Sequence, residues 1–276
     1  MDNTNWSRQT EDKPLFPDVL WSRPENKRHA GKLLIIGGHS QSFSVPSRAY
    51  AAALKAGAGH VRILLPDSLQ KTVGKAFPEA EFAPSTPIGS FSRPALDLFL
   101  DLATWSDMVL LAGDFGKNSE TAILLEAFVD KYSGPLTLAG DSIDYFSLKP
   151  TQLINRKSTL IAGNLGQMQK LAQPEAMIKQ SADLVQILDL LSIWTSGIAA
   201  NIVTSASEKI IVGCRGKLST TPAKNNRIEV ELAAHASVWL MQQPEIRIPH
   251  LRNLQLRIRI VHMGSPLFED KQWGKA

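Results

Sequence analysis

The sequence predicts an α/β protein whose central, mostly parallel sheet is covered by helices on both faces. Three observations support this prediction. Short apolar runs alternate with longer helical patterns, and turn-forming or polar residues follow most of the apolar runs. The chain of 276 residues is also long enough to bury one large core. Strands that alternate with helices form parallel sheets, because each crossover helix lies on a face of the sheet.

The predicted strands are short apolar runs, which are typical of strands buried on both faces. A proline-rich stretch, 78–94, shows no clear period and is predicted to be a loop that contains an edge strand. The runs predicted as strands are 33–36, 61–65, 108–112, 136–139, 159–162, 201–204, 210–212 and 217–220.

The predicted helices separate these strands. The alanine-rich segment 44–56 stops at Gly57, and segment 119–131 has apolar residues three and four apart after a cap at Asn118 or Ser119. Segment 183–194 is amphipathic and stops near Gly197. The full set of predicted helices is 44–56, 68–75, 95–103, 119–131, 183–194 and 228–241.

The composition excludes several classes of protein. No window approaches the roughly 18 consecutive apolar residues of a membrane span. The first eleven residues are polar and lack the apolar region of a secretory signal. Cys214 is the one cysteine, so no internal disulfide can form, which fits a reducing compartment. We therefore expect a cytoplasmic protein without membrane partners.

The basic charge lies at one end of the chain. The formal net charge is +4, and residues 247–276 contain six Lys or Arg and two Asp or Glu residues. The remaining chain is neutral, which argues against nucleic acid as a partner. We expect residues 1–27 to be an N-terminal extension, 28–243 one domain, and 244–276 a basic tail.

Ligands of parallel α/β sheets bind beyond the carboxyl ends of the strands. Gly37 and Gly38 follow the first strand, but the third glycine of a dinucleotide fingerprint is absent, which favours a close turn over phosphate contact. The segment from Gly113 to Gly116 could let a ligand lie against backbone or could form a turn, and both interpretations stay open.

Polar side chains follow the next two strands. Asp141 could hold a hydroxyl group, a base or the water of a magnesium ion, or it could cap a helix. Asn164 and Gln167 can both donate and accept hydrogen bonds, which suits an amide or a ribose, although Asn164 could also be a cap.

Other chemistries lack the residues that they need. The six histidines have no metal-ligand spacing and no Cys/His cluster exists, so we expect no metal site built from these residues. No Gly-x-Ser-x-Gly sequence supports a hydrolase. The spacing of Tyr50 and Lys55 does not match the pair of a short-chain dehydrogenase.

Taken together, four segments in the same order resemble the ADP- or ATP-dependent NAD(P)H-hydrate dehydratases of the ribokinase-like superfamily. The resemblance covers residues 28–241. "HAGKLLIIGGHSQSFSVPSRAYAAALKAGAGHVRILLP" is similar to the family's opening, and "LAGDFGKNSETAILLEAF" to its Gly-Pro-Gly-Leu-Gly segment and helix. "PLTLAGDSIDYF" resembles its Asp-Ala-Asp-Ala-Leu-Asn segment, and "LIAGNLGQMQKL" its Thr-Pro-His-Pro-Gly-Glu-Met segment. The resemblance implies a ribokinase-like three-layer sandwich.

The resemblance also implies a function. In this family a nucleoside phosphate drives the removal of water from hydrated NADH or NADPH, which is a metabolite-repair reaction. The implied ligands are ADP or ATP and the hydrated cofactor, with Mg²⁺ as a further candidate and a homo-oligomer left open. The aligned positions around the hydrated cofactor are Val45, Asp114 and Asn164, with Asp141 as a polar anchor. The aligned nucleotide-binding positions are Ser205, Ala206, Ser207, Glu208 and Lys209, of which Lys209 is the one cation.

The sequence departs from the family pattern at several positions. The family's histidine and glutamate are Asn164 and Gln167 here, and no Gly-Ser-Gly-Asp or Gly-Thr-Gly-Asp segment supplies an anion hole and a catalytic aspartate. Glu229 and Glu231 are the nearby carboxylates that could substitute for that aspartate, or they could simply favour the start of a helix. A relative that binds a nucleotide or cofactor without turnover is therefore one alternative. A small-molecule kinase of the same superfamily is a second, disfavoured because it needs the missing aspartate.

Overall fold

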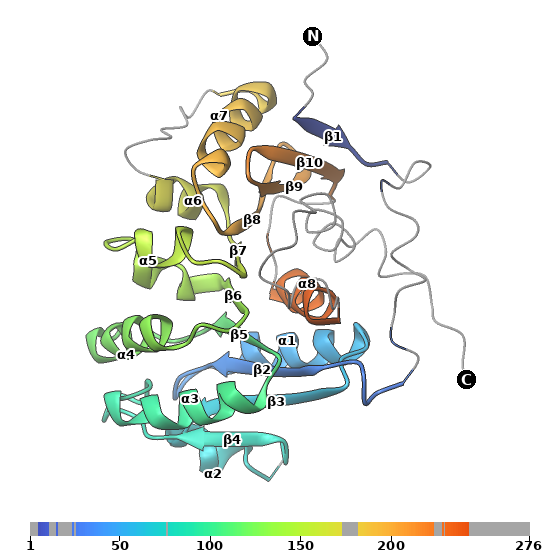
Figure 1. Cartoon of the computed structure of the whole chain (residues 1–276). Coiled ribbons are helices and arrows are strands. Elements are labelled where there is room, and N and C mark those ends of the chain that lie inside the picture. Colours follow the sequence, from blue (N-terminus) through green and yellow to red (C-terminus); the bar gives the residue numbers. More distant parts are fainter. Residues whose placement is uncertain are drawn as a thin grey trace.

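A computed structural model describes residues 5–10, 15, 24, 26–75, 77–172, 182–223, 228 and 230–242. These residues form a three-layer α/β sandwich around one sheet, in the strand order β1-β10-β9-β8-β7-β6-β5-β2-β3-β4 (Figure 1). The strands are β1 (Trp6–Arg8), β2 (Lys32–Gly37), β3 (His60–Pro66), β4 (Ala80–Ala83), β5 (Met108–Gly113), β6 (Leu136–Ala139), β7 (Thr159–Ala162), β8 (Asn201–Ala206), β9 (Lys209–Cys214) and β10 (Lys217–Pro222).

Helices cover both faces of the sheet. The α-helices are α1 (Ser44–Lys55), α2 (Gln70–Val73), α3 (Leu96–Trp105), α4 (Ser119–Lys131), α5 (Thr151–Ile154), α6 (Leu165–Ala172), α7 (Leu184–Ser196) and α8 (Val230–Gln242). Short 3-10 helices lie at Asp67–Leu69, Arg93–Ala95, Gly140–Ser142 and Asp144–Phe146. Side chains of α3 to α7 pack on one face, and those of α1, α2 and α8 pack on the other.

The apolar strand runs are buried on both faces, as their composition predicted. In β2, Leu34 and Ile36 belong to the core under α3 to α7, whereas Leu33 and Ile35 belong to the core under α1 and α8. All four side chains are fully buried. Such continuous apolar runs are the expected pattern of a parallel sheet that is covered twice.

The direction of the strands changes near one edge of the sheet. From β8 through β7, β6, β5, β2 and β3 to β4 all neighbours are parallel. In contrast, β9 is antiparallel to both β8 and β10. The mostly parallel sheet predicted from the sequence is thus confirmed, and the three consecutive strands 201–204, 210–212 and 217–220 form an antiparallel meander at its end.

The N-terminal extension contributes a strand that the sequence did not predict. Residues 6–8 form β1, which pairs in parallel with β10, and Trp6 Nε1 donates a hydrogen bond of 3.0 Å to Thr220 Oγ1. The three residues Trp-Ser-Arg carry no apolar run or alternation, so their pairing depends on the partner strand rather than on local sequence. Residues 244–276, predicted to be a basic tail, lie outside the described residues.

The sheet has a topological switch point between β2 and β5. The chain leaves β2 through α1 toward β3 on one side, and it leaves β5 through α4 toward β6 on the other (Figure 1). Because α1 and α4 lie on opposite faces, the chain runs from the ends of β2 and β5 toward opposite faces of the sheet. Such a divergence at the carboxyl ends of adjacent strands is where open α/β sheets bind ligands.

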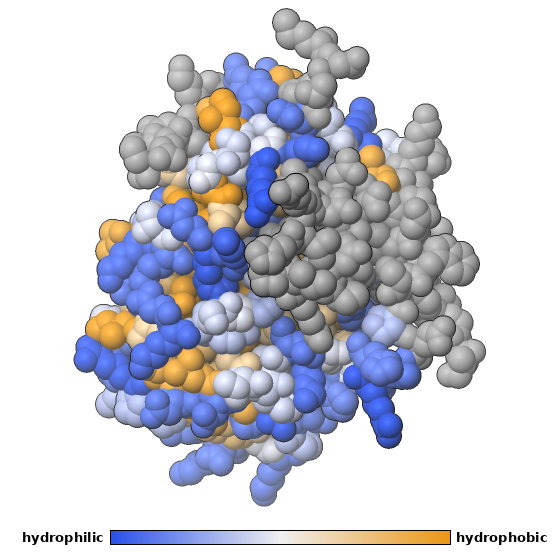
Figure 2. All heavy atoms as spheres, viewed as in Figure 1, coloured by the Kyte–Doolittle hydropathy of each residue, from blue (hydrophilic) through white to orange (hydrophobic). Residues whose placement is uncertain are grey.

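The surface of the described residues shows scattered apolar side chains. Three exposed apolar side chains are Ile123 of α4, Leu148 of the loop before α5, and Ile193 of α7. Figure 2 shows separate apolar patches among hydrophilic residues. Isolated exposed apolar side chains are normal for folded proteins. In the part of the chain that the structure describes, no helix combines the length and apolar character needed to cross a membrane.

Candidate functional site

Asp114 joins the loops that follow β2 and β5. Its Oδ2 atom accepts hydrogen bonds from the Ser42 hydroxyl at 2.6 Å and from the Val45 backbone N–H at 3.1 Å. Asp114 itself has a φ of +60°, a left-handed conformation that aspartate tolerates better than most residues. The structure therefore brings together Asp114 and Val45, two of the positions that the sequence assigned to the cofactor.

The glycine pair after β2 permits this contact. A Cβ atom on Gly37 would lie 2.4 Å from the Gly113 carbonyl oxygen, and the Gly38 N–H donates to that same oxygen at 3.0 Å. A side chain at position 37 would push the two loops apart. The preferred sequence interpretation, a close turn, agrees with this geometry.

Asp141 lies against the same loop. Its Oδ2 atom accepts a hydrogen bond of 3.2 Å from the Phe115 backbone N–H. Burial raises the pKa of Asp141, the Phe115 N–H partly opposes the rise, and the negative charge of Asp114 adds to it. A half-buried carboxyl group with a raised pKa is a common feature of functional sites.

One peptide group separates Asp141 from a histidine. The N–H of the Asp114–Phe115 peptide donates to Asp141, and its carbonyl oxygen lies 2.9 Å from His39 Nδ1. His39 follows Gly38 and closes a tight turn, in which its backbone exchanges two hydrogen bonds with Ser42. Two titratable side chains thus flank one polarised peptide at the switch point.

Asn164 caps helix α6, as one of the two sequence interpretations proposed. Its Oδ1 atom accepts from the Gln167 N–H at 2.9 Å, and its own N–H donates to Gln167 Oε1 at 3.1 Å. These reciprocal bonds form a capping box. Gln167 Nε2 also donates to the Gly140 carbonyl and to Asp144, each at 2.9 Å, so the cap is connected to the loop that carries Asp141.

The predicted substrate positions thus share one hydrogen-bonded network. Val45 connects to Asp114, the Asp114–Phe115 peptide connects to Asp141, and Gly140 connects through Gln167 to Asn164. The network spans the carboxyl ends of β2, β5, β6 and β7. Sequence reasoning assigned no role to His39 and Ser42, although both lie in the quoted segment after Gly38.

The predicted nucleotide segment is a tight β-hairpin. Ser205 and Ala206 end β8 with buried side chains, and Lys209 begins β9 opposite Ala206. The two residues between them, Ser207 and Glu208, have φ values of +48° and +55°. Positive φ at both central residues is the feature of a type I′ turn. The turn contains no glycine and carries an acidic side chain, so its backbone does not form a glycine-rich phosphate loop, and Lys209 is the one basic side chain of the segment.

The candidate carboxylates at the last helix are only partly described. Glu231 lies in the first turn of α8, and its Oε1 atom is 3.5 Å from Arg48 Nε of α1. Its Oε2 atom is buried without a hydrogen-bond partner among the described residues. Glu229 lies outside the described residues.

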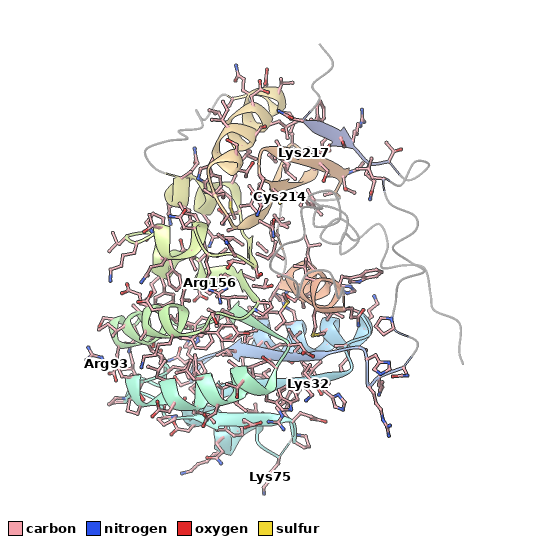
Figure 3. The ribbon with its side chains drawn as sticks, in the orientation of Figure 1. Lys32, Lys75, Arg93, Arg156, Cys214 and Lys217 are labelled. Atoms are coloured by element: carbon pink, nitrogen blue, oxygen red, sulfur yellow. The ribbon has the colours of Figure 1, made fainter. Side chains whose placement is uncertain are left out.

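A cavity of about 540 Å³ lies at the other end of the strands. It is lined near the starts of β2 and β3 by Lys32, Arg62 and Trp105 (Lys32 is labelled in Figure 3). Arg62 stacks 4.1 Å from the Trp105 ring and pairs with Glu81 at 3.1 Å. These cations already have partners inside the protein, and the switch point has the arrangement that α/β sheets use for ligands. We therefore place the candidate site at the switch point.

The described residues contain no cluster of three or more His, Cys, Asp or Glu side chains that could hold a metal ion. Asp114 is also occupied by Ser42 and Val45, and Asp141 by Phe115. These carboxylates thus do not fit a resident Mg²⁺ site, which requires several free oxygen ligands.

Comparisons with known proteins identify relatives of this chain. No family model matches it. Proteins named "bifunctional NAD(P)H-hydrate repair enzyme Nnr" match in part: 34% identity over 119 residues in Methanocaldococcus jannaschii, and 31% over 121 residues in Methanothermobacter thermautotrophicus. Each alignment covers 43% of this chain. The matched region spans only 23% of the length of either relative.

Solved structures share the fold at low sequence identity. A ribokinase-like superfamily protein from Enterococcus faecalis has a TM-score of 0.70 and 16% identity over 96% of this chain and 88% of its own. An ADP/ATP-dependent NAD(P)H-hydrate dehydratase from Bacillus subtilis, co-crystallised with ATP and Mg²⁺, has a TM-score of 0.56 and 11% identity over 87% of this chain and 80% of its own. The ribokinase-like fold predicted from the sequence is thus confirmed. This chain therefore has a ribokinase-like α/β fold, and over 43% of its length it is similar to proteins named NAD(P)H-hydrate repair enzymes.

Proposed function

We propose that this chain binds hydrated NADH or NADPH at the switch point and removes water to restore the reduced cofactor. One observation carries the proposal: Val45, Asp114, Asp141 and Asn164, which the family resemblance assigned to the hydrated cofactor, belong to one hydrogen-bonded network. The homology to proteins named NAD(P)H-hydrate repair enzymes supports the same substrate class.

The network is suited to hold a polar ligand in one orientation. Asp114 fixes the start of α1, and Gln167 fixes the loop that carries Asp141. Because these hydrogen bonds already hold the loops, a bound ligand would not have to order them itself, and such preorganisation favours binding. The side chain of Asp141 stays partly exposed and can meet a hydroxyl group of the ligand.

The test of this function is the recovery of NADH absorbance from purified NADH hydrate. We expect turnover by the wild type that increases when ADP or ATP is added. A pure, folded preparation with no rate above that of buffer, with either nucleotide, would refute the dehydratase activity. Spontaneous epimerisation and degradation of the hydrate are controlled by the same assay without protein.

The nucleotide site is tested separately at the β8–β9 hairpin. We infer that the phosphates lie near Lys209, the one cation of the aligned segment, with any Mg²⁺ entering as part of the nucleotide complex. Lys209→Ala should weaken ATP or ADP binding about 10- to 150-fold, since a hydrogen bond to a charged group contributes roughly 1.5–3 kcal/mol. The matched control is Lys217→Ala, because Lys217 begins β10 at the opposite end of the meander (Figure 3).

Binding without turnover is the second candidate function. It is favoured by the hairpin geometry, since Ser207 and Glu208 form a closed turn at the positions that the family resemblance assigned to the nucleotide. Calorimetry separates the two candidates. Heat on addition of NADH hydrate, without any recovery of NADH absorbance, would select this alternative, and the absence of heat with hydrate, ADP or ATP would exclude both.

A further inference from the structure

We propose that His39 is the group that accepts a proton from the ligand in this site. The inference rests on the proposed function and names a residue that neither the family resemblance nor the comparisons assign. Its basis is the position of His39 at the switch point, where it directly contacts the Asp114 backbone.

The contact with Asp114 determines which ring nitrogen is available. The partner of His39 Nδ1 is a carbonyl oxygen at 2.9 Å, and a carbonyl oxygen can only accept a hydrogen bond. Nδ1 therefore carries the hydrogen, and the lone pair of the neutral ring is on Nε2. No hydrogen bond among the described residues involves Nε2, and the His39 side chain is partly exposed.

The surroundings hold the ring in one place. A Cβ atom on Gly116 would lie 3.5 Å from both Cγ and Cδ2 of His39, so the backbone of the Gly116 turn packs beside the ring. The His39 backbone N–H and C=O are both used by Ser42, at 2.8 and 2.9 Å. A ring that is fixed by one nitrogen and open at the other resembles the arrangement of histidine bases in general, which depend on an orienting hydrogen bond.

His39 and Asp141 are two titratable side chains that one peptide group separates. The same Asp114–Phe115 peptide accepts from His39 and donates to Asp141, so the two side chains lie on opposite sides of it. Separated titratable groups in unlike environments are how enzymes divide acid and base roles. Burial raises the pKa of Asp141, and His39 Nε2 is the open acceptor.

The proton transfer fits the dehydration of the hydrate. Nε2 takes the proton from the ring carbon next to the hydroxyl-bearing carbon, and the electron pair of that C–H bond becomes the new C=C bond. The C–O bond breaks with its electron pair on oxygen. The oxygen leaves as water after taking a proton from solvent, or as phosphate if the nucleotide has first transferred its phosphoryl group to it. A positioned base of this kind contributes about 10²- to 10⁴-fold to a rate.

His39→Asn is the sharpest test, because the asparagine amide N–H can replace Nδ1–H at Asp114 while no basic nitrogen remains. We expect kcat to fall by about 10²- to 10⁴-fold with KM near that of the wild type, and the melting temperature to stay unchanged. His60→Asn is the matched control, because His60 is exposed at the start of β3 and should leave kcat unchanged. A wild type that turns over while His39→Asn retains kcat within threefold would refute the inference and leave the proposed function standing.

A second readout does not depend on turnover. Diethyl pyrocarbonate acylates imidazole nitrogens that carry a lone pair, and peptide mass spectrometry locates the product. We expect His39 to be acylated in the free protein and protected by saturating NADH hydrate, while the exposed His29 and His60 react equally in both samples. Unchanged acylation of His39 in the presence of hydrate would overturn its placement facing the ligand, even if the wild type is inactive.

Discussion

The two ends of the predicted site differ in how the chain is organised. At the switch point, loops from distant parts of the sequence are connected through Asp114, Asp141 and Gln167. At the β8–β9 hairpin, the predicted nucleotide segment is closed by a local two-residue turn. The first region keeps polar groups at the ends of several strands, whereas the second satisfies its backbone by itself. The comparison shows that the predicted cofactor positions are connected across several loops, whereas the predicted nucleotide positions form a closed local turn.

Of the substitutions that test this comparison, Asp114→Ala should have the largest effect on stability and on hydrate binding. Asp114→Ala removes the acceptor of the Ser42 hydroxyl and the Val45 N–H, and two lost hydrogen bonds should cost about 2–3 kcal/mol of unfolding free energy. We also expect at least about tenfold weaker binding of NADH hydrate. Urea titration and calorimetry measure the two quantities.

Asp114→Asn is the matched control. Asparagine also tolerates the positive φ and keeps an acceptor oxygen, so it should lose less than half as much stability as Asp114→Ala. Equal stability and equal hydrate affinity in wild type and Asp114→Ala would show that the network does not organise the site.

The next effect concerns the cap of α6. Asn164→Ala removes the side chain that accepts from the Gln167 N–H and should cost about 1 kcal/mol of unfolding free energy. Asn164→Ser keeps a capping oxygen and should cost only a few tenths of a kcal/mol. If the amide also contacts the cofactor, both variants bind hydrate more weakly; full affinity in Asn164→Ser would limit Asn164 to capping.

A smaller effect, with a defined pH dependence, is expected at Asp141. Its pKa is raised in the folded protein by burial, so the folded state binds the proton more tightly than the unfolded state. The stability that Asp141 contributes is present below the ordinary pKa of 3.8 and is lost as the pH rises through the raised folded value.

Asp141→Asn should therefore be more stable than the wild type at neutral pH, and the difference should shrink on acidification. Denaturant titrations at several pH values measure it. Asp101→Asn, at an exposed position of α3, is the control and should show no such trend. A difference that grows toward acid pH would contradict the raised pKa.

The smallest expected effect is on the free energy of unfolding, at the turn of the β8–β9 hairpin. Ser207→Gly relieves a left-handed conformation that costs roughly 1–2 kcal/mol, but glycine also adds about 0.5–1 kcal/mol of unfolded-state entropy. We expect a net gain of about 0.5 kcal/mol by thermal or urea unfolding. Ser205→Gly, in the extended strand β8, should instead lose stability. A loss in both variants would mean that residue 207 is not held in the left-handed region.

The sequence by itself determined the layers of the fold and most of their elements. Mainly apolar runs such as 136–139 and 159–162 became buried strands with the predicted boundaries, because strands buried on both faces are nearly continuous apolar runs. The helix 119–131 also has the predicted boundaries, and Asn118 supplies its cap. The alternation of strands and helices also indicated that the polar residues after the strands, such as Asp141 and Asn164, lie at one edge of the sheet.

The tertiary structure decided what local patterns do not contain. The pairing of β1 with β10 joins residues 6–8 to residues 218–220, and no local signal in Trp-Ser-Arg indicates that partner. The capping of α6 by Asn164 depended on where the Gln167 side chain points. His39 gained its defined tautomer only because the loop after β5, 75 residues later in the chain, places the carbonyl oxygen of Asp114 beside its ring. Such contacts depend on how the strands are ordered in the sheet, which the spacing of residues along the chain does not specify.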